Sequence, residues 1–174
     1  MNNTKTIFKS LLIMIVAISL FTVSCSKDEG GKKTPTNPTI VKVSAQNITD
    51  TLKGLGQLKD TDNTTVILDF TSINPQNGSD TITGANKSFN KVKTALTTVF
   101  GTPQAILTIT TDLDGKTQPG GSTALEVNIT FKANSGFEFD ESITDTGKTT
   151  YTYNASDKSA KLTLKITPAN PWEA

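Results

Sequence analysis

Residues 125–132 alternate strictly between apolar and polar side chains, and this pattern restricts the fold more than any other. The apolar members are Leu125, Val127, Ile129 and Phe131, and the polar members are Glu126, Asn128, Thr130 and Lys132. Successive side chains of a strand point to opposite faces, so this strand has one buried face and one wet face. Antiparallel sheets commonly have this asymmetry. The segment therefore predicts an antiparallel sheet with one face open to solvent.

Further segments have the composition of strands, being rich in β-branched or aromatic residues. They are residues 40–43, 66–73, 105–111, 149–153 and 161–167. In the last of these, Leu162, Leu164 and Ile166 are expected to point inward. The polar residues 154–159 suit a turn that joins the last two strands.

Residues 85–100 have the spacing of an amphipathic helix. One side carries Phe89, Val92, Ala95, Leu96, Val99 and Phe100. Gly101 can take the left-handed position after the last turn, and Pro103 prevents continuation. The apolar side predicts core packing.

A second helix is predicted over residues 47–58, where Ile48, Leu52, Leu55 and Leu58 have near-helical spacing. Gly54 and Gly56 weaken it. Together these patterns predict an α+β domain at residues 40–174, with one or two helices covering one face of a mainly antiparallel sheet. A β-sandwich with a helical insertion is the alternative.

The first 24 residues have the three parts of a bacterial export signal. Lys5 and Lys9 precede an apolar run at residues 11–21, and the small Ser24 stands before Cys25. A run of about eleven residues is short for a permanent span, which needs ~20. Cys25 is the only cysteine, so no disulfide can form within the chain.

This arrangement resembles the lipobox of bacterial lipoproteins. The resemblance implies cleavage after residue 24, a diacylglyceryl group on the Cys25 thiol and acylation of the new amino group. It also implies a location in the bacterial envelope, at the outer membrane, and leaves open whether the domain is exposed at the cell surface. Thr22 departs from the family's pattern, because leucine usually stands three residues before the cysteine.

Residues 25–39 are expected to form a flexible tether between the lipid and the domain. Residues 26–39 contain two glycines and two prolines and no large apolar side chain. The first large apolar residue after them is Ile40. The run from Ser26 to Glu29 resembles a surface-export signal of some Bacteroidota lipoproteins. The format as a whole resembles small outer-membrane lipoprotein antigens of spirochaetes or Bacteroidota.

Composition argues against several classes of function. The chain has 17 lysines and no histidine or arginine, so the commonest general base and the usual bidentate phosphate clamp are absent. Its formal charge is +1, and removal of residues 1–24 takes it to about −1, which gives no basic excess for nucleic acid.

Three short acidic clusters are candidates for metal or carboxylate chemistry: Asp60 with Asp62, Asp112 with Asp114, and Asp140 with Glu141. The run from Asp112 fails the calcium-loop pattern, because Lys116, Thr117 and Thr123 stand at positions 5, 6 and 12. We interpret all three as turns, and expect no catalytic residue, metal or cofactor. Trp172, beside Pro171, is expected to cap the core.

The sequence therefore favours a non-catalytic, lipid-anchored antigen, adhesin or accessory binding module. A threonine-, lysine- and asparagine-rich β surface, with Tyr151 and Tyr153 on one strand, would contact a protein or glycan. Two alternatives remain: a carboxylate-based enzyme acting on envelope polysaccharide, and a structural partner of an envelope assembly.

Overall fold

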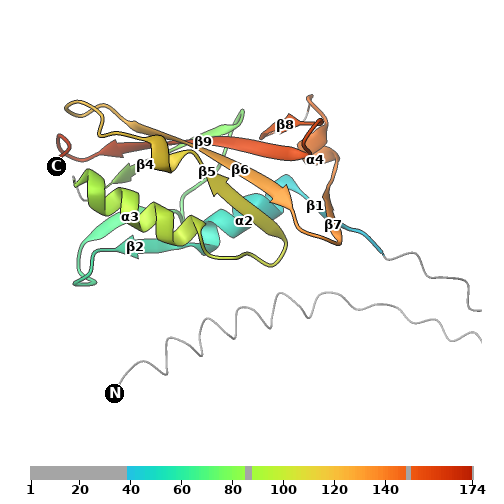
Figure 1. Cartoon of the computed structure of the whole chain (residues 1–174), viewed down its shortest axis with the longest axis horizontal. Helices are drawn as coiled ribbons and strands as arrows, with labels where there is room; N and C mark the ends of the chain where they lie inside the picture. Colours follow the sequence, from blue (N-terminus) through green and yellow to red (C-terminus); the bar gives the residue numbers. More distant parts are fainter. Residues whose placement is uncertain (1–38, 85–87, 148–149, 174) are drawn as a thin grey trace, which may run out of the picture. The chain divides into compact units, whose positions relative to one another are not determined.

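Figure 1 shows a computed structural model, which describes residues 39–84, 88–147 and 150–173. The predicted export segment, Cys25 and all of the predicted tether except Thr39 lie outside these residues. The elements in chain order are β1 (Val41–Val43), α2 (Ala45–Gly54), β2 (Gln57–Lys59), β3 (Val66–Asp69), β4 (Ser79–Gly84), α3 (Phe89–Phe100), β5 (Leu107–Thr111), η1 (Leu113–Gly115), β6 (Leu125–Ala133), β7 (Phe137–Phe139), α4 (Glu141–Thr144), β8 (Thr152–Asn154) and β9 (Ser159–Pro168).

The alternating segment forms β6, which lies in the middle of a five-stranded sheet. The order is β4-β9-β6-β5, and the short β8 also pairs with β9. The β6–β9 pair is antiparallel and places Val127 opposite Leu164 and Ile129 opposite Leu162. All four side chains are buried. The predicted inward face of both strands is therefore confirmed.

The sheet is mixed, because β4 runs parallel to β9 while β5, β6 and β8 make antiparallel pairs. Two further pairs lie outside it. β1 runs parallel to β7, and β2 forms an antiparallel hairpin with β3.

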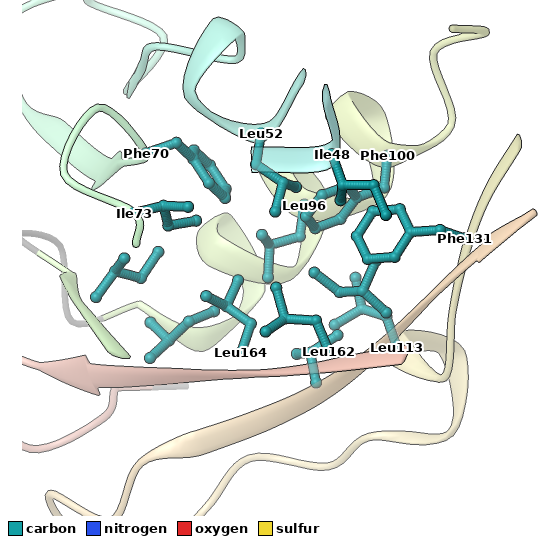
Figure 2. Packing of buried hydrophobic residues seen from close by; sticks show 14 of the residues in the cluster. Ile48, Leu52, Phe70, Ile73, Leu96, Phe100, Leu113, Phe131, Leu162 and Leu164 are labelled. Atoms are coloured by element: carbon teal, nitrogen blue, oxygen red, sulfur yellow. The ribbon is translucent and has the colours of Figure 1, made fainter. Parts of the chain in front are cut away.

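Both longer helices contribute to one core with the inner face of the sheet. Ile48 and Leu52 of α2 and Leu96 of α3 are fully buried. Figure 2 shows these side chains facing Leu162 and Leu164 of β9. The α+β prediction is confirmed.

The helix starts follow from local capping. Ser44 precedes α2 and accepts a hydrogen bond from the Asn47 backbone N–H at 3.2 Å, while the Asn47 side chain accepts from the Ser44 N–H at 2.9 Å. Such a reciprocal pair satisfies two N–H groups that the first turn leaves free. Ser88 caps α3 by a single bond of this kind, because its side chain accepts from the Lys91 backbone N–H.

Several predicted boundaries were wrong for local reasons. The first helix ends at Gly54, and Gly56 at φ +67° redirects the chain, so Leu58 belongs to β2. Gly101 is not left-handed, since its φ is −74°. A Cβ at Gly101 would lie 2.9 Å from the Thr97 carbonyl oxygen. β2, β4 and β7 were not predicted.

Trp172 fixes the C-terminal segment against the start of α3. It is 6% exposed, and its ring meets Phe89 edge-to-face at a centroid distance of 6.0 Å. Its indole Nε1–H donates to the Thr123 carbonyl oxygen at 2.8 Å, and its backbone N–H donates to Gly121 at 2.9 Å. The predicted capping role of Trp172 is thus visible in its contacts.

Replacing Phe89 with alanine should lower the free energy of unfolding by about 3–4 kcal/mol, because a buried ring is lost. It should also shift Trp172 fluorescence to longer wavelength, since this is the only tryptophan and it loses its covering ring. Denaturant titration and emission spectra measure both effects. Thr97→Ala, at an exposed position of the same helix, is the control and should cost less than about 0.5 kcal/mol. An unchanged emission maximum in Phe89→Ala would contradict the packing.

Candidate binding surface

The outer face of the five-stranded sheet carries almost only polar side chains. The helices pack on the inner face, and the alternate residues of β5, β6 and β9 point outward; all of them except the buried Ser159 are exposed or half-buried. The exposed or half-buried outward residues are Thr108, Thr110, Glu126, Asn128, Thr130, Lys132, Lys161, Thr163, Lys165 and Thr167. We refer to this set, with Asp112 and Lys116 at its margin, as the polar face.

A hydrogen-bonded chain crosses the polar face from β9 to the end of β5. The Thr163 hydroxyl donates to Asn128 Oδ1 at 3.0 Å. Asn128 donates from Nδ2 to Asp112 Oδ2 at 2.7 Å and from its backbone N–H to Asp112 Oδ1 at 2.9 Å. Lys116 Nζ lies 3.0 Å from Asp112 Oδ2. These contacts hold the amide and carboxylate in fixed positions.

The charge state of Asp112 follows from these contacts. Partial burial acts to raise its pKa, but the hydrogen bonds from Lys116 and Asn128 outweigh burial and keep the pKa of this carboxyl below its usual value. Asp112 is therefore ionised at neutral pH and serves as an anchor for the network.

A shallow hollow of about 500 Å³ lies over the middle of the polar face. Its lining includes Thr110, Asp112, Asn128, Thr130 and Lys161. Thr110 stands opposite Thr130 in the β5–β6 register, and Thr130 stands opposite Lys161 in the β6–β9 register. The hollow thus offers two hydroxyls and an amine in one row across three strands, and the Asn128 amide lies in the neighbouring row.

Charge on the polar face is mainly positive. Glu126 pairs with Lys165 at 3.1 Å, and Asp112 pairs with Lys116. Lys132 and Lys161 are exposed and make no ion pair within residues 39–84, 88–147 and 150–173, although the charge of each helps to lower the pKa of Asp157. Their amines can therefore meet an anionic or hydroxyl-rich partner.

The predicted acidic clusters serve local structure. Asp60 receives a hydrogen bond from Lys91 Nζ at 2.5 Å, and that bond lowers the pKa of Asp60. Asp62 accepts from the Thr64 backbone and side chain, which lowers its pKa as well. Asp140 is the N-cap of α4 and accepts from the Ser142 N–H at 2.9 Å. These roles agree with the interpretation of the clusters as turns.

Within the described residues, the structure contains no group of three or more His, Cys, Asp or Glu side chains that could hold a metal ion. No helix in the same part of the chain is long and apolar enough to cross a membrane. Cys25, the predicted lipidation site, lies outside the described residues.

Sequence reasoning missed a second cavity, of about 340 Å³, between α3 and the β2–β3 hairpin. Ile67 and Ala95 give it an apolar lining, and Lys59, Asp60 and Lys91 are among its polar residues. The signal was present in β3, where Ile67 points away from the face that carries Leu68 and Phe70. Ile67 is 3% exposed without belonging to the main core.

The predicted pair of surface tyrosines was wrong. β8 begins only at Thr152, and Tyr151 before it turns into the core, where it is 1% exposed. Its hydroxyl lies 2.8 Å from Thr49 Oγ1, and its ring meets Phe131 edge-to-face. Tyr153 is half-buried and packs against Phe139. Neither ring adds an aromatic platform to the polar face.

Comparison with protein-family models, with curated proteins and with solved structures found no match to this chain.

Tyr151 should titrate at unusually high pH, because burial raises its pKa to about 12 despite the opposing hydrogen bond with Thr49. The chain has two tyrosines, so Tyr153→Phe leaves Tyr151 as the only reporter in an ultraviolet titration of tyrosinate. The folded protein holds this proton more tightly than the unfolded chain, whose tyrosine pKa is about 10. Stability from this group is therefore constant below pH ~10 and falls between pH ~10 and ~12. A midpoint near 10 with the fold intact would show that Tyr151 is solvated.

Proposed function

We propose that this chain is a lipid-anchored lipoprotein of the bacterial envelope, exposed at the outer membrane, whose domain binds a protein or glycan without catalysing a reaction. The polar face is the binding surface. The observation that carries the proposal is the arrangement of that face: one open row of fixed polar groups, flanked by lysine amines, opposite the helix-covered core.

The chemistry of the surface favours polar recognition. Among the described residues, Ile40 is the only large apolar side chain that is mostly exposed, at 51%. Contiguous exposed apolar surface is the usual mark of a hydrophobic protein interface. A ligand rich in hydroxyl or carboxylate groups fits the hydroxyls, amide and amines of the polar face better.

The acidic residues argue against the enzyme alternative. A glycosidase needs two carboxyl groups about 5–10 Å apart on either side of a sugar. Asp62 and Asp140 hold turns or caps, and Asp60 and Asp112 each bond a lysine. Each of these four carboxylates makes a hydrogen bond or ion pair that stabilises the fold, which supports a binding function over a hydrolytic one.

The anchor rests on the sequence of the export segment. A thioether-linked diacylglyceryl group supplies two acyl chains, and each buried CH₂ contributes about 0.8 kcal/mol. Two or three chains therefore hold a protein to a membrane far longer than one.

Replacing Cys25 with serine should abolish lipidation, because the only thiol of the chain is lost. The measurement is detergent phase partitioning of the wild type and the variant after expression in a bacterium. The wild type should enter the detergent phase and Cys25→Ser should not. Ser24→Ala keeps a small residue before the cysteine and serves as the control. Equal partitioning of the wild type and Cys25→Ser would contradict the anchor.

Reversing the charge of Lys161, which lines the hollow, should weaken the affinity of the polar face for its ligand. Lys161→Glu places a carboxylate beside Thr130 and should weaken binding of an anionic or hydroxyl-rich ligand at least tenfold, measured on glycan and peptide arrays. Lys53→Glu, at an exposed position of α2, makes the same change of charge away from the sheet and should have no effect. Equal losses in both variants would indicate nonspecific attraction. Turnover of an envelope polysaccharide that Asp112→Asn or Asp140→Asn abolishes would favour the enzyme.

A further inference from the structure

β5 is an outer strand of the five-stranded sheet, and the side that faces away from β6 pairs with no strand in the described part of the chain. Figure 1 shows β5 alongside β6 at that edge. An outer strand offers a row of free peptide N–H and C=O groups that can pair with another strand.

The hydrogen-bonding pattern identifies which groups of β5 face outward. The Ile106 carbonyl oxygen accepts from the Asn134 N–H at 3.0 Å, and the Asp112 N–H donates to the Asn128 carbonyl oxygen at 3.2 Å. In an antiparallel pair, alternate residues bond to the neighbour. The even-numbered residues therefore bond to β6, and the peptide groups of Leu107, Ile109 and Thr111 point away from the sheet.

The opposite edge of the sheet, formed by β4 and β8, is partly occupied by its own chain. The Asn74 N–H donates to the Asp80 side chain at 2.6 Å, and Gln76 exchanges backbone bonds with Ser79 at 3.0 and 3.1 Å, so the chain before β4 covers its start. β8 occupies the rest of that side and is three residues long.

β5 lacks the devices that usually prevent pairing at an edge. Its sequence, Leu-Thr-Ile-Thr-Thr, contains no charged residue and no proline. Its register with β6 runs from Leu107 to Thr111 without a shift, so no bulge twists the edge away. A strand of this composition is compatible with a neutral partner strand.

We propose that β5 pairs with β5 of a second copy of this chain, antiparallel, about a two-fold axis at Ile109. The peptide groups that point away from β6, those of Leu107, Ile109 and Thr111, are symmetric about Ile109. Ile109 then stands opposite Ile109 of the second copy, and Leu107 stands opposite Thr111 of the second copy. Each of these pairs exchanges two N–H···O bonds, and every outward peptide group of the strand finds a partner.

The side chains suit this register. On the polar face, Thr108 meets Thr110 of the second copy, a favourable cross-strand pair. On the inner face, the half-buried Ile109 is covered by its own counterpart. Asp112, at the end of the strand, is already bonded to Asn128 and Lys116, so no carboxylate is left without a partner at the junction.

This pairing gives a closed dimer, because a two-fold contact uses the same strand of both copies and leaves neither β5 edge free for a third copy. It also joins the two polar faces into one continuous surface. That consequence rests on the proposed function, whereas the pairing itself does not.

Sedimentation equilibrium of the intact chain, in detergent matched in density to the solvent, tests the pairing. The protein mass should double as concentration rises. Ile109→Lys should remain monomeric, because two ammonium groups would meet at the axis. Ile109→Thr keeps a neutral β-branched side chain and should still dimerise. An equimolar mixture of Ile109→Lys and Ile109→Glu should regain the dimer mass, and this recovery depends on residue 109 facing itself.

A second variant separates edge pairing from misfolding. Ile109→Pro removes an outward N–H and leaves the bonds to β6 in place, so the variant should keep its circular dichroism spectrum and lose the dimer. A wild type that stays monomeric at every concentration overturns the proposal. So does a dimer that persists in Ile109→Lys and Ile109→Pro. A dimer lost only with Cys25→Ser overturns it in favour of association through lipid.

Discussion

The antiparallel pairing of β6 with β9 is the contact on which the rest of this structure depends. It is the longest pairing in the sheet and runs from Leu125 opposite Ile166 to Lys132 opposite Ser159. Because both strands alternate in phase, the pair presents an unbroken apolar surface on one side. α2, α3 and the β2–β3 hairpin contribute their buried residues to that surface. A shift of one residue in this register would turn the core face of a strand toward water.

The same alternation produces the polar face, the side of the domain that we propose binds a ligand. Every inward leucine, isoleucine or valine of β6 is followed by an outward polar residue, so the core and the polar face come from one pattern. Threonine is suited to this position, since its β-branched side chain fits a pleated strand while its hydroxyl stays available. The fold and the proposed binding surface are therefore two consequences of one sequence periodicity.

Sequence reasoning recovered the elements whose patterns are long and regular, and missed those whose signal is short. The stripe of α3 and the alternation of β6 and β9 each extend over several turns or pairs. β4 contains Ile82 as its one large apolar residue, and its parallel pairing to β9 joins segments about 80 residues apart, which local spacing cannot reveal. The polar face was predictable in composition, but the chain from Thr163 through Asn128 to Asp112 depends on strand order and register. Tyr151 was wrongly predicted to lie on a surface strand, because β8 begins only after it, at Thr152. Its ring is buried against Phe131 instead.

Some groups of the polar face are held by hydrogen bonds and others are not, and this difference affects the conformational entropy that the proposed binding would cost. Asn128 and Asp112 are already held by neighbours, so a ligand that bonds to this network does not have to restrict them again. Threonine side chains have few rotamers and lose little entropy when a partner orders them. Lysine loses up to about 2 kcal/mol of rotamer freedom, so Lys132 and Lys161 gain most from a ligand whose charge offsets that loss. For the proposed ligand, the hydrogen-bonded centre therefore defines the shape that can bind, and the exposed lysine amines beside it define the charge.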